Sequence, residues 1–211
     1  MRNSSYAKVT AAVVAAWFIF SLSASALHVF NDPSRPGLAV GLAALVPVLL
    51  FLLLFNASSG FRRFSLGLNP RVLTLAHTWR VGGLTFLVLN AFGILPGIFA
   101  FPAGLGDFFI GVTAPLMAWW YARPEHRNRF LLWQGLGILD LVTAVSLGTT
   151  AGLISPHGVA TSAMTVLPLS MVPTFFVPLL LILHIACIAQ ARRWPQGQQL
   201  PSGEAMETSA A

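Results

Sequence analysis

Residues 69–107 read NPRVLTLAHTWRVGGLTFLVLNAFGILPGIFAFPAGLGD. This stretch places His77 and Arg80 inside an apolar segment, breaks at the Pro- and Gly-rich residues 93–106, and ends on Asp107. Ionisable groups inside a membrane segment are energetically costly, so they are candidates for function wherever they occur. The stretch therefore predicts two neighbouring membrane helices that carry polar groups between them.

The composition of the whole chain is that of a membrane protein. Of its 211 residues, 56% are hydrophobic and only 9% are charged, whereas soluble domains carry about 25% charged residues. Mean hydropathy is +0.76, and the apolar residues come in long blocks of nearly the ~20 residues that a helix needs to cross a bilayer. These features exclude an ordinary soluble domain.

Six apolar blocks predict an all-α integral membrane protein, a bundle of six transmembrane helices in a single domain over residues 1–194. The predicted spans cover residues 9–30, 37–55, 71–95, 103–121, 130–149 and 168–190. Residues 195–211 are polar and predicted to be a disordered cytoplasmic tail. The first block also fits a cleaved signal peptide, because Ala24-Ser25-Ala26 resembles a cleavage site, but its length favours a retained helix.

The basic residues alternate between the loops. They gather in the N-terminal segment (Arg2, Lys8), the second loop (Arg62, Arg63, Arg71), the fourth loop (Arg123, Arg127, Arg129) and the tail (Arg192, Arg193). The first, third and fifth loops have only Arg35 between them. Since Lys and Arg mark cytoplasmic loops, both termini are predicted in the cytoplasm, and the clean bias favours a bacterial inner membrane.

The net charge of +6 follows from this loop pattern. No basic helix or long basic run is present, so we expect no nucleic-acid partner, only the lipid bilayer and a homo-oligomer. Cys187 is the single cysteine, which allows neither an internal disulfide nor a cysteine-based metal site, and we expect it to be a small packing residue. No metal ligand set is recognised.

Two stretches leave the helix boundaries open. The third span starts either at Arg71 or near Val81, and in the second case residues 70–80 lie on the membrane surface. Residues 93–106 are predicted to form no regular helix, only a re-entrant loop or a tight outer turn, because Pro and Gly interrupt them. The fourth span then begins near residue 103, which puts Asp107 near the outer face as a helix cap or in an outer vestibule.

Depth along the spans predicts which polar residues meet. Arg80 and Asp140 lie roughly 13 and 15 Å from the cytoplasmic side, and His77 and His184 roughly 9 and 10 Å. We therefore expect an Arg80–Asp140 ion pair inside a buried polar cluster of all four residues, in the cytoplasmic half and without Asp107. The alternative is structural: an ion pair that sets helix register and two histidines with separate hydrogen bonds.

Four functions remain open on these residues. The first is a small proton-coupled transporter or ion-responsive membrane protein, since buried His, Asp and Arg build proton relays and broken helices build substrate sites. The second is a b-type haem redox protein with His77 and His184 as axial ligands and Arg80 on a propionate. The third, an enzyme acting on lipid-linked substrates, lacks any hydrolase motif, and no catalytic residue is assigned. The fourth is a non-catalytic scaffold or accessory subunit.

Overall fold

A computed structural model describes residues 2–31, 38–154 and 159–195 of the chain. Across these ranges every regular element is a helix. Six helical segments are long and apolar enough to cross a membrane, as the composition predicted. These segments run over Ser5–Ala26, Leu38–Ala57, Pro70–Ala91, Gly97–Tyr121, Pro124–Ala151 and Val172–Ala191.

The first half of the chain forms a long pair of helices and then a segmented one. Its elements are α1 (Arg2–Ala26), α2 (Leu38–Ala57), the short α3 (Ser59–Leu66), and then α4 (Pro70–Leu75), η1 (Ala76–Gly83) and α5 (Leu84–Ala91). The last three follow one another without a break, so a 3₁₀ segment interrupts one membrane-length helix at its middle. Such mid-helix 3₁₀ segments often mark a functional hinge or local strain.

The second half of the chain repeats this use of irregular turns. Its elements are α6 (Gly97–Leu116), which continues as the π-helical turn η2 (Met117–Tyr121), then η3 (Pro124–His126), α7 (Arg127–Ile154), η4 (Ser162–Thr165), the π-helical turn η5 (Val172–Phe176) and α8 (Val177–Ala191). π-helical turns are rare and occur frequently at functional sites.

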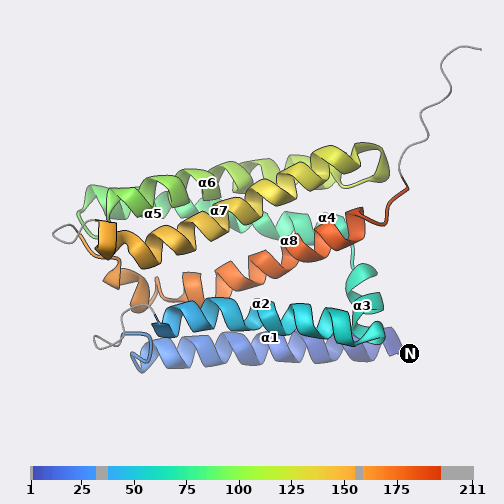
Figure 1. Ribbon diagram of the computed structural model, residues 1–211, viewed down its shortest axis with the longest axis horizontal. Coiled ribbons are helices and arrows are strands. Elements are labelled where there is room, and N and C mark those ends of the chain that lie inside the picture. The colour runs from blue at the N-terminus through green and yellow to red at the C-terminus, as the bar shows by residue number, and fades with distance from the viewer. Residues whose placement is uncertain (1, 32–37, 155–158, 196–211) are drawn as a thin grey trace, which may run out of the picture.

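Helix α8 lies between two groups of helices (Figure 1). On one side it packs against α2, and on the other against α4 and α7, while α6 packs against η1, α5 and α7. Helix α1 is joined to this arrangement through η5, where Trp17 Nε1 donates to the backbone oxygen of Thr174 at 3.2 Å and the Trp17 ring packs at a tilt against Phe175. Helix α3 closes the end of the bundle near the N-terminus (Figure 1).

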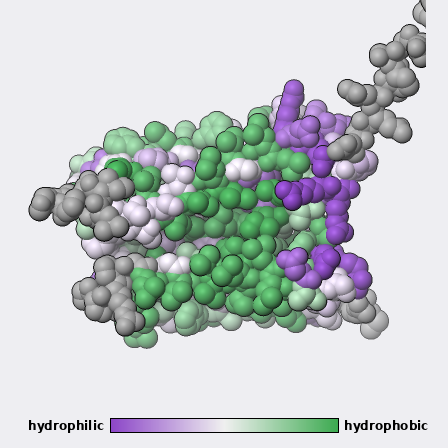
Figure 2. All heavy atoms as spheres, in the orientation of Figure 1, coloured by the Kyte–Doolittle hydropathy of each residue, from purple (hydrophilic) through white to green (hydrophobic). Residues whose placement is uncertain are grey.

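The outside of the molecule is apolar around its middle and hydrophilic at its ends (Figure 2). Large side chains such as Leu49, Leu53, Val88 and Leu139 are exposed on this band. The strongly hydrophilic end is the one that carries α3 and the C-terminus of α8. A contiguous exposed apolar surface of this extent fits a lipid environment rather than water.

The structure shows where both of these helices begin. Asn69 caps α4, its Oδ1 accepting the Arg71 N–H at 2.9 Å, and helical structure continues from Pro70 to Ala91 as one segment of membrane length. The prediction of no regular helix over residues 93–106 was wrong for most of that stretch. Only a tight turn at residues 92–96 is irregular, with Gly93 at φ 69°, and α6 begins at Gly97.

The physical reason lies in tertiary packing, which overrides helix propensity. Gly104 and Gly106 lie on the side of α6 that faces other helices, where a side chain would press tightly on the Gly83 carbonyl at position 104 and collide with Asp140 at position 106. The glycines therefore serve close helix approach, and Pro102 is accommodated within the helix. The tail beyond residue 195, predicted to be disordered, lies outside the described residues.

Candidate functional site

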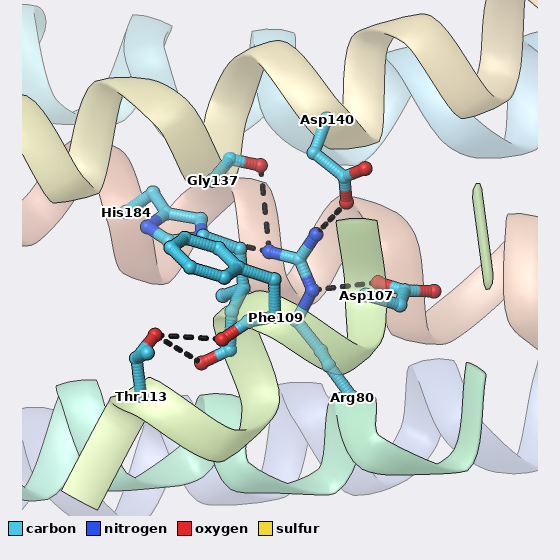
Figure 3. Close-up of polar contacts among 8 residues, drawn as sticks. Arg80, Asp107, Phe109, Thr113, Gly137, Asp140 and His184 are labelled. Carbon is cyan, nitrogen blue, oxygen red and sulfur yellow. Dashed lines mark hydrogen bonds and ion pairs between the residues drawn. The ribbon is translucent and has the colours of Figure 1, made fainter. Parts of the chain in front are cut away.

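Arg80 is the centre of the polar cluster. Its side chain is 1% exposed and projects from η1 toward α6 and α7. Nε donates to Asp107 Oδ1 at 2.6 Å, and Nη2 donates to Asp140 Oδ2 (Figure 3). The two carboxylate side chains are each 14% exposed, so one buried guanidinium joins two acids that retain some access to their surroundings. We call Arg80, Asp107 and Asp140 the triad.

The third guanidinium nitrogen fixes the protonation of His184. Arg80 Nη1 lies 3.4 Å from the Gly137 carbonyl oxygen and 3.1 Å from His184 Nε2. Arginine has only donors, so His184 Nε2 must accept, and the ring proton then sits on Nδ1. Nδ1 accordingly donates to Gln134 Oε1 at 2.5 Å. His184 is therefore held neutral, in one tautomer, by its two partners.

A line of hydrogen bonds continues from His184 toward the basic end of the bundle. Gln134 Nε2 donates to Thr74 Oγ1 at 3.4 Å. Thr74 Oγ1 in turn donates at 2.8 Å to the carbonyl of Pro70, the first residue of α4. Sequence reasoning did not place Thr74 in the site, since a lone threonine in an apolar helix is usually a packing residue that bonds its own backbone. The line orients His184 and Gln134.

His77 meets His184 but not through a hydrogen bond. The two rings stack with centroids 3.8 Å apart and an interplanar angle of 25°. His77 is fully buried, and neither of its ring nitrogens has a hydrogen-bond partner among the described residues. The two histidines therefore lie at the same depth along the bundle, as predicted, and they contact each other through a ring stack.

This stack does not fit a haem. Axial ligands occupy opposite faces of the iron, whereas these rings face each other in van der Waals contact. Both nitrogens of His184 are already engaged, by Arg80 and Gln134, and the guanidinium is engaged by two carboxylates instead of a propionate. We therefore derive no chemistry through a haem.

Asp107 is the main correction to the predicted site. The expectation placed it near the outer face, as a cap or in a vestibule, apart from the cluster. The structure places it ten residues into α6, roughly 15 Å along the helix axis, because α6 begins at Gly97 and not near residue 103. It is bonded to Arg80, and its side chain approaches η1 closely because position 83 is glycine.

Glycine also makes room for the Asp140 carboxylate and for the His184 ring. A Cβ at Gly106 would collide with the Asp140 carboxylate, and one at Gly137 would collide with the His184 ring. In the sequence, Gly-x-Gly precedes each acid: Gly104-Leu-Gly106 stands directly before Asp107, and Gly135-Leu-Gly137 stands three residues before Asp140. That spacing was the available signal that both acids lie at helix crossings.

The triad lies at the middle of its helices, whereas His77 and His184 lie in the half nearer the basic end, as predicted for the whole cluster. Arg80 is ten residues from Pro70 and eleven from Ala91, and Asp140 is thirteen residues from Arg127 and fourteen from Ile154. The predicted depths were measured from span starts that the structure extends outward, so the triad is deeper than expected.

A cavity of about 620 Å³ reaches the triad from the end of the bundle opposite the basic one. Its walls come from α2, α5, α6, α7, η5 and the start of α8, together with Phe30 and Asn31, which follow α1, and residues 160–165. Asp107 is the one ionisable residue on this wall within the part of the chain that the structure describes. In Figure 3 the second carboxylate oxygen of Asp107 points away from Arg80.

The charges of the triad do not balance when both acids are ionised. One guanidinium faces two carboxylates, and the adjacent His184 is neutral. One negative charge remains in a low-dielectric interior, where an uncompensated charge is strongly unfavourable. The arrangement can therefore bind one proton or one cation.

The fold and site together define an all-helical protein with six membrane-length helices around a buried Asp–Arg–Asp triad. The chain belongs to the family of the domain of unknown function DUF8737, which matches residues 37–192. The match includes every triad residue and leaves α1 outside. No curated protein and no solved structure matches the chain.

Proposed function

We propose that this protein is a small proton-coupled membrane transporter in which the triad of Arg80, Asp107 and Asp140 alternates between a proton and a cation. The observation that carries the proposal is the charge imbalance of the triad at the inner end of a cavity. In the proton-loaded state one carboxylic acid and one carboxylate face Arg80. In the cation-loaded state both are carboxylates.

The position of the triad supports this assignment. Substrate and coupling-ion sites of secondary transporters lie near the bilayer midplane, at interrupted helices. Arg80 lies in the 3₁₀ segment η1 at the middle of the segment Pro70–Ala91, and the cavity ends at its partner Asp107. The π-helical turn η5, which lines the cavity, provides a second irregular site where a helix can bend without losing its whole hydrogen-bond ladder.

We further propose that the bundle inserts in a bacterial inner membrane with its basic end in the cytoplasm. Arg62, Arg127 and Arg192 belong to elements that meet at the strongly hydrophilic end, and the apolar band covers the middle (Figure 2). With this orientation the cavity faces the outer side and the line of hydrogen bonds through Gln134 and Thr74 extends toward the cytoplasm.

The test is proton flux in proteoliposomes that trap a pH-sensitive dye. A pH gradient is imposed, and inorganic cations, organic cations, amino acids and carboxylic acids are added in turn. We expect at least one class of cation to dissipate the gradient with wild-type protein, and Asp107→Asn to abolish the effect. Arg123→Gln, in the connection after η2 and outside both the triad and the cavity wall, is the matched control and retains the flux.

Two outcomes would reject the proposal. A folded wild type that moves no proton with any class of solute has no proton coupling. Full activity in both Asp107→Asn and Asp140→Asn would show that the triad only holds the helices together, which is the scaffold function.

A further inference from the structure

We propose that the cavity is a binding site for a lipophilic organic cation of one positive charge, such as an aromatic amine or a quaternary ammonium or phosphonium compound, with Asp107 as its counter-ion. This inference rests on the proposed function and names the substrate class of the same site.

The size and lining of the cavity favour an organic ligand. Its volume of about 620 Å³ falls in the range of roughly 300–1,000 Å³ that holds drug-sized molecules. Most of the wall is apolar, from residues such as Ala44, Leu141 and Val145. A hydrated inorganic cation would need several oxygen ligands in place of this carbon surface.

The hydroxyl groups on the wall add little to a cation site. Thr161 Oγ1 donates to the Gly148 carbonyl at 2.7 Å, and Thr149 Oγ1 donates to the Val145 carbonyl at 2.9 Å. These bonds hold the hydroxyls against the backbone of α7. Electrostatic recognition of the ligand therefore falls to Asp107.

Aromatic rings complete a site for a positive charge. Phe30, Phe86 and Phe99 line the cavity, and the rings of Phe86 and Phe99 lie 5.5 Å apart, centroid to centroid. Ring faces attract cations, and the attraction grows when the site excludes water. An anion of the same shape would meet both the rings and the carboxylate with unfavourable charge.

Binding of the cation changes the proton count by one. The cation supplies the positive charge that the proton supplied, so the shared proton leaves the carboxyl groups of Asp107 and Asp140 for solvent. No covalent bond between heavy atoms forms or breaks. The net charge of the triad plus its ligand stays at zero in both states.

The test uses two probes of matched shape and opposite charge, tetraphenylphosphonium and tetraphenylborate, with the detergent-purified full chain. Equilibrium dialysis measures binding, and a pH electrode in weak buffer measures released protons. We expect saturable binding of the phosphonium, at least tenfold weaker binding of the borate, and about one proton released per phosphonium bound.

Three variants locate the site. Asp107→Asn should weaken phosphonium binding at least tenfold and remove proton release. Ala44→Trp fills the cavity and leaves the triad intact, so it should also weaken binding at least tenfold. Leu45→Trp, at the neighbouring position, which is 53% exposed and outside the cavity wall, is the matched control and should bind as wild type.

The outcomes separate this inference from the proposed function. Equal binding of both probes, or unchanged phosphonium binding in Ala44→Trp, overturns the organic-cation site, whereas proton flux with another class of solute still supports proton coupling. Saturable phosphonium binding lost in Ala44→Trp, with no proton release, keeps the site and overturns the coupling.

Discussion

The charge count of the triad makes a quantitative prediction about stability. Asp107→Asn or Asp140→Asn alone leaves Arg80 with one carboxylate, so the triad becomes neutral without a proton. The double variant leaves Arg80 with no acid, although its side chain is 1% exposed. We therefore expect each single change to be mild and the double change to be severe.

The magnitudes follow from general values for buried charges. Each asparagine weakens one charged hydrogen bond, which changes the unfolding free energy by about 1 kcal/mol. A buried charge that loses its counter-ions costs about 3–5 kcal/mol. The double variant should therefore lose roughly 1–3 kcal/mol more than the sum of the two single variants.

The assay is equilibrium unfolding of the four proteins in mixed micelles of a mild detergent and sodium dodecyl sulfate, followed by tryptophan fluorescence. Arg80→Met is the reciprocal variant, and it should be as severe as the double one because two carboxylates then face each other. Additivity of the two aspartate changes within about 0.5 kcal/mol would refute the reasoning, since independent sites behave in that way.

Three further predictions concern the surroundings of the triad and the orientation of the chain. Gly137→Ala should lower the free energy of unfolding by about 1–3 kcal/mol in the same assay, since the added methyl group meets the His184 ring. Gly135→Ala, where the added methyl group meets no neighbouring atom, should change the free energy of unfolding by less than about 1 kcal/mol. His77→Leu should raise the free energy of unfolding by about 1 kcal/mol in the same assay, because it removes a buried imidazole that has no hydrogen-bond partner among the described residues; a clear loss would contradict this. In a cysteine-free background, Glu125→Cys should react with a membrane-impermeant maleimide only from the cytoplasmic side and Val159→Cys only from the outside; the reverse labelling would contradict the orientation.

Much of the architecture follows from the sequence because it depends on composition. Long apolar blocks can satisfy their backbone groups in lipid only as helices, so six blocks predict six membrane-length helices, which the structure has. The depth of a residue along a helix depends only on how many residues separate it from the start of that helix. For that reason the sequence could place Arg80 beside Asp140, and His77 beside His184, without knowing how the helices pack.

Asp107 shows where this reasoning stops. Its membership of the triad depends on where α6 begins, and Pro and Gly in residues 93–106 argue locally against a helix there. The helix forms because Gly83, Gly104 and Gly106 lie at close contacts between neighbouring helices, where a side chain would collide at positions 83 and 106 and be crowded at position 104. Local propensity is worth up to about 1 kcal/mol for each glycine, which close packing of whole helices readily exceeds.

The sequence by itself determined the helical class, the membrane-length segments and the shared levels of Arg80 with Asp140 and of His77 with His184, because each depends on the order of residues along one axis. The tertiary structure alone decided the second acid of the triad, the neutral tautomer of His184 and the cavity that ends at Asp107. Those features depend on which faces of different helices meet, and that is set by side-chain shape at the crossings, especially the absence of side chains at Gly83, Gly106 and Gly137.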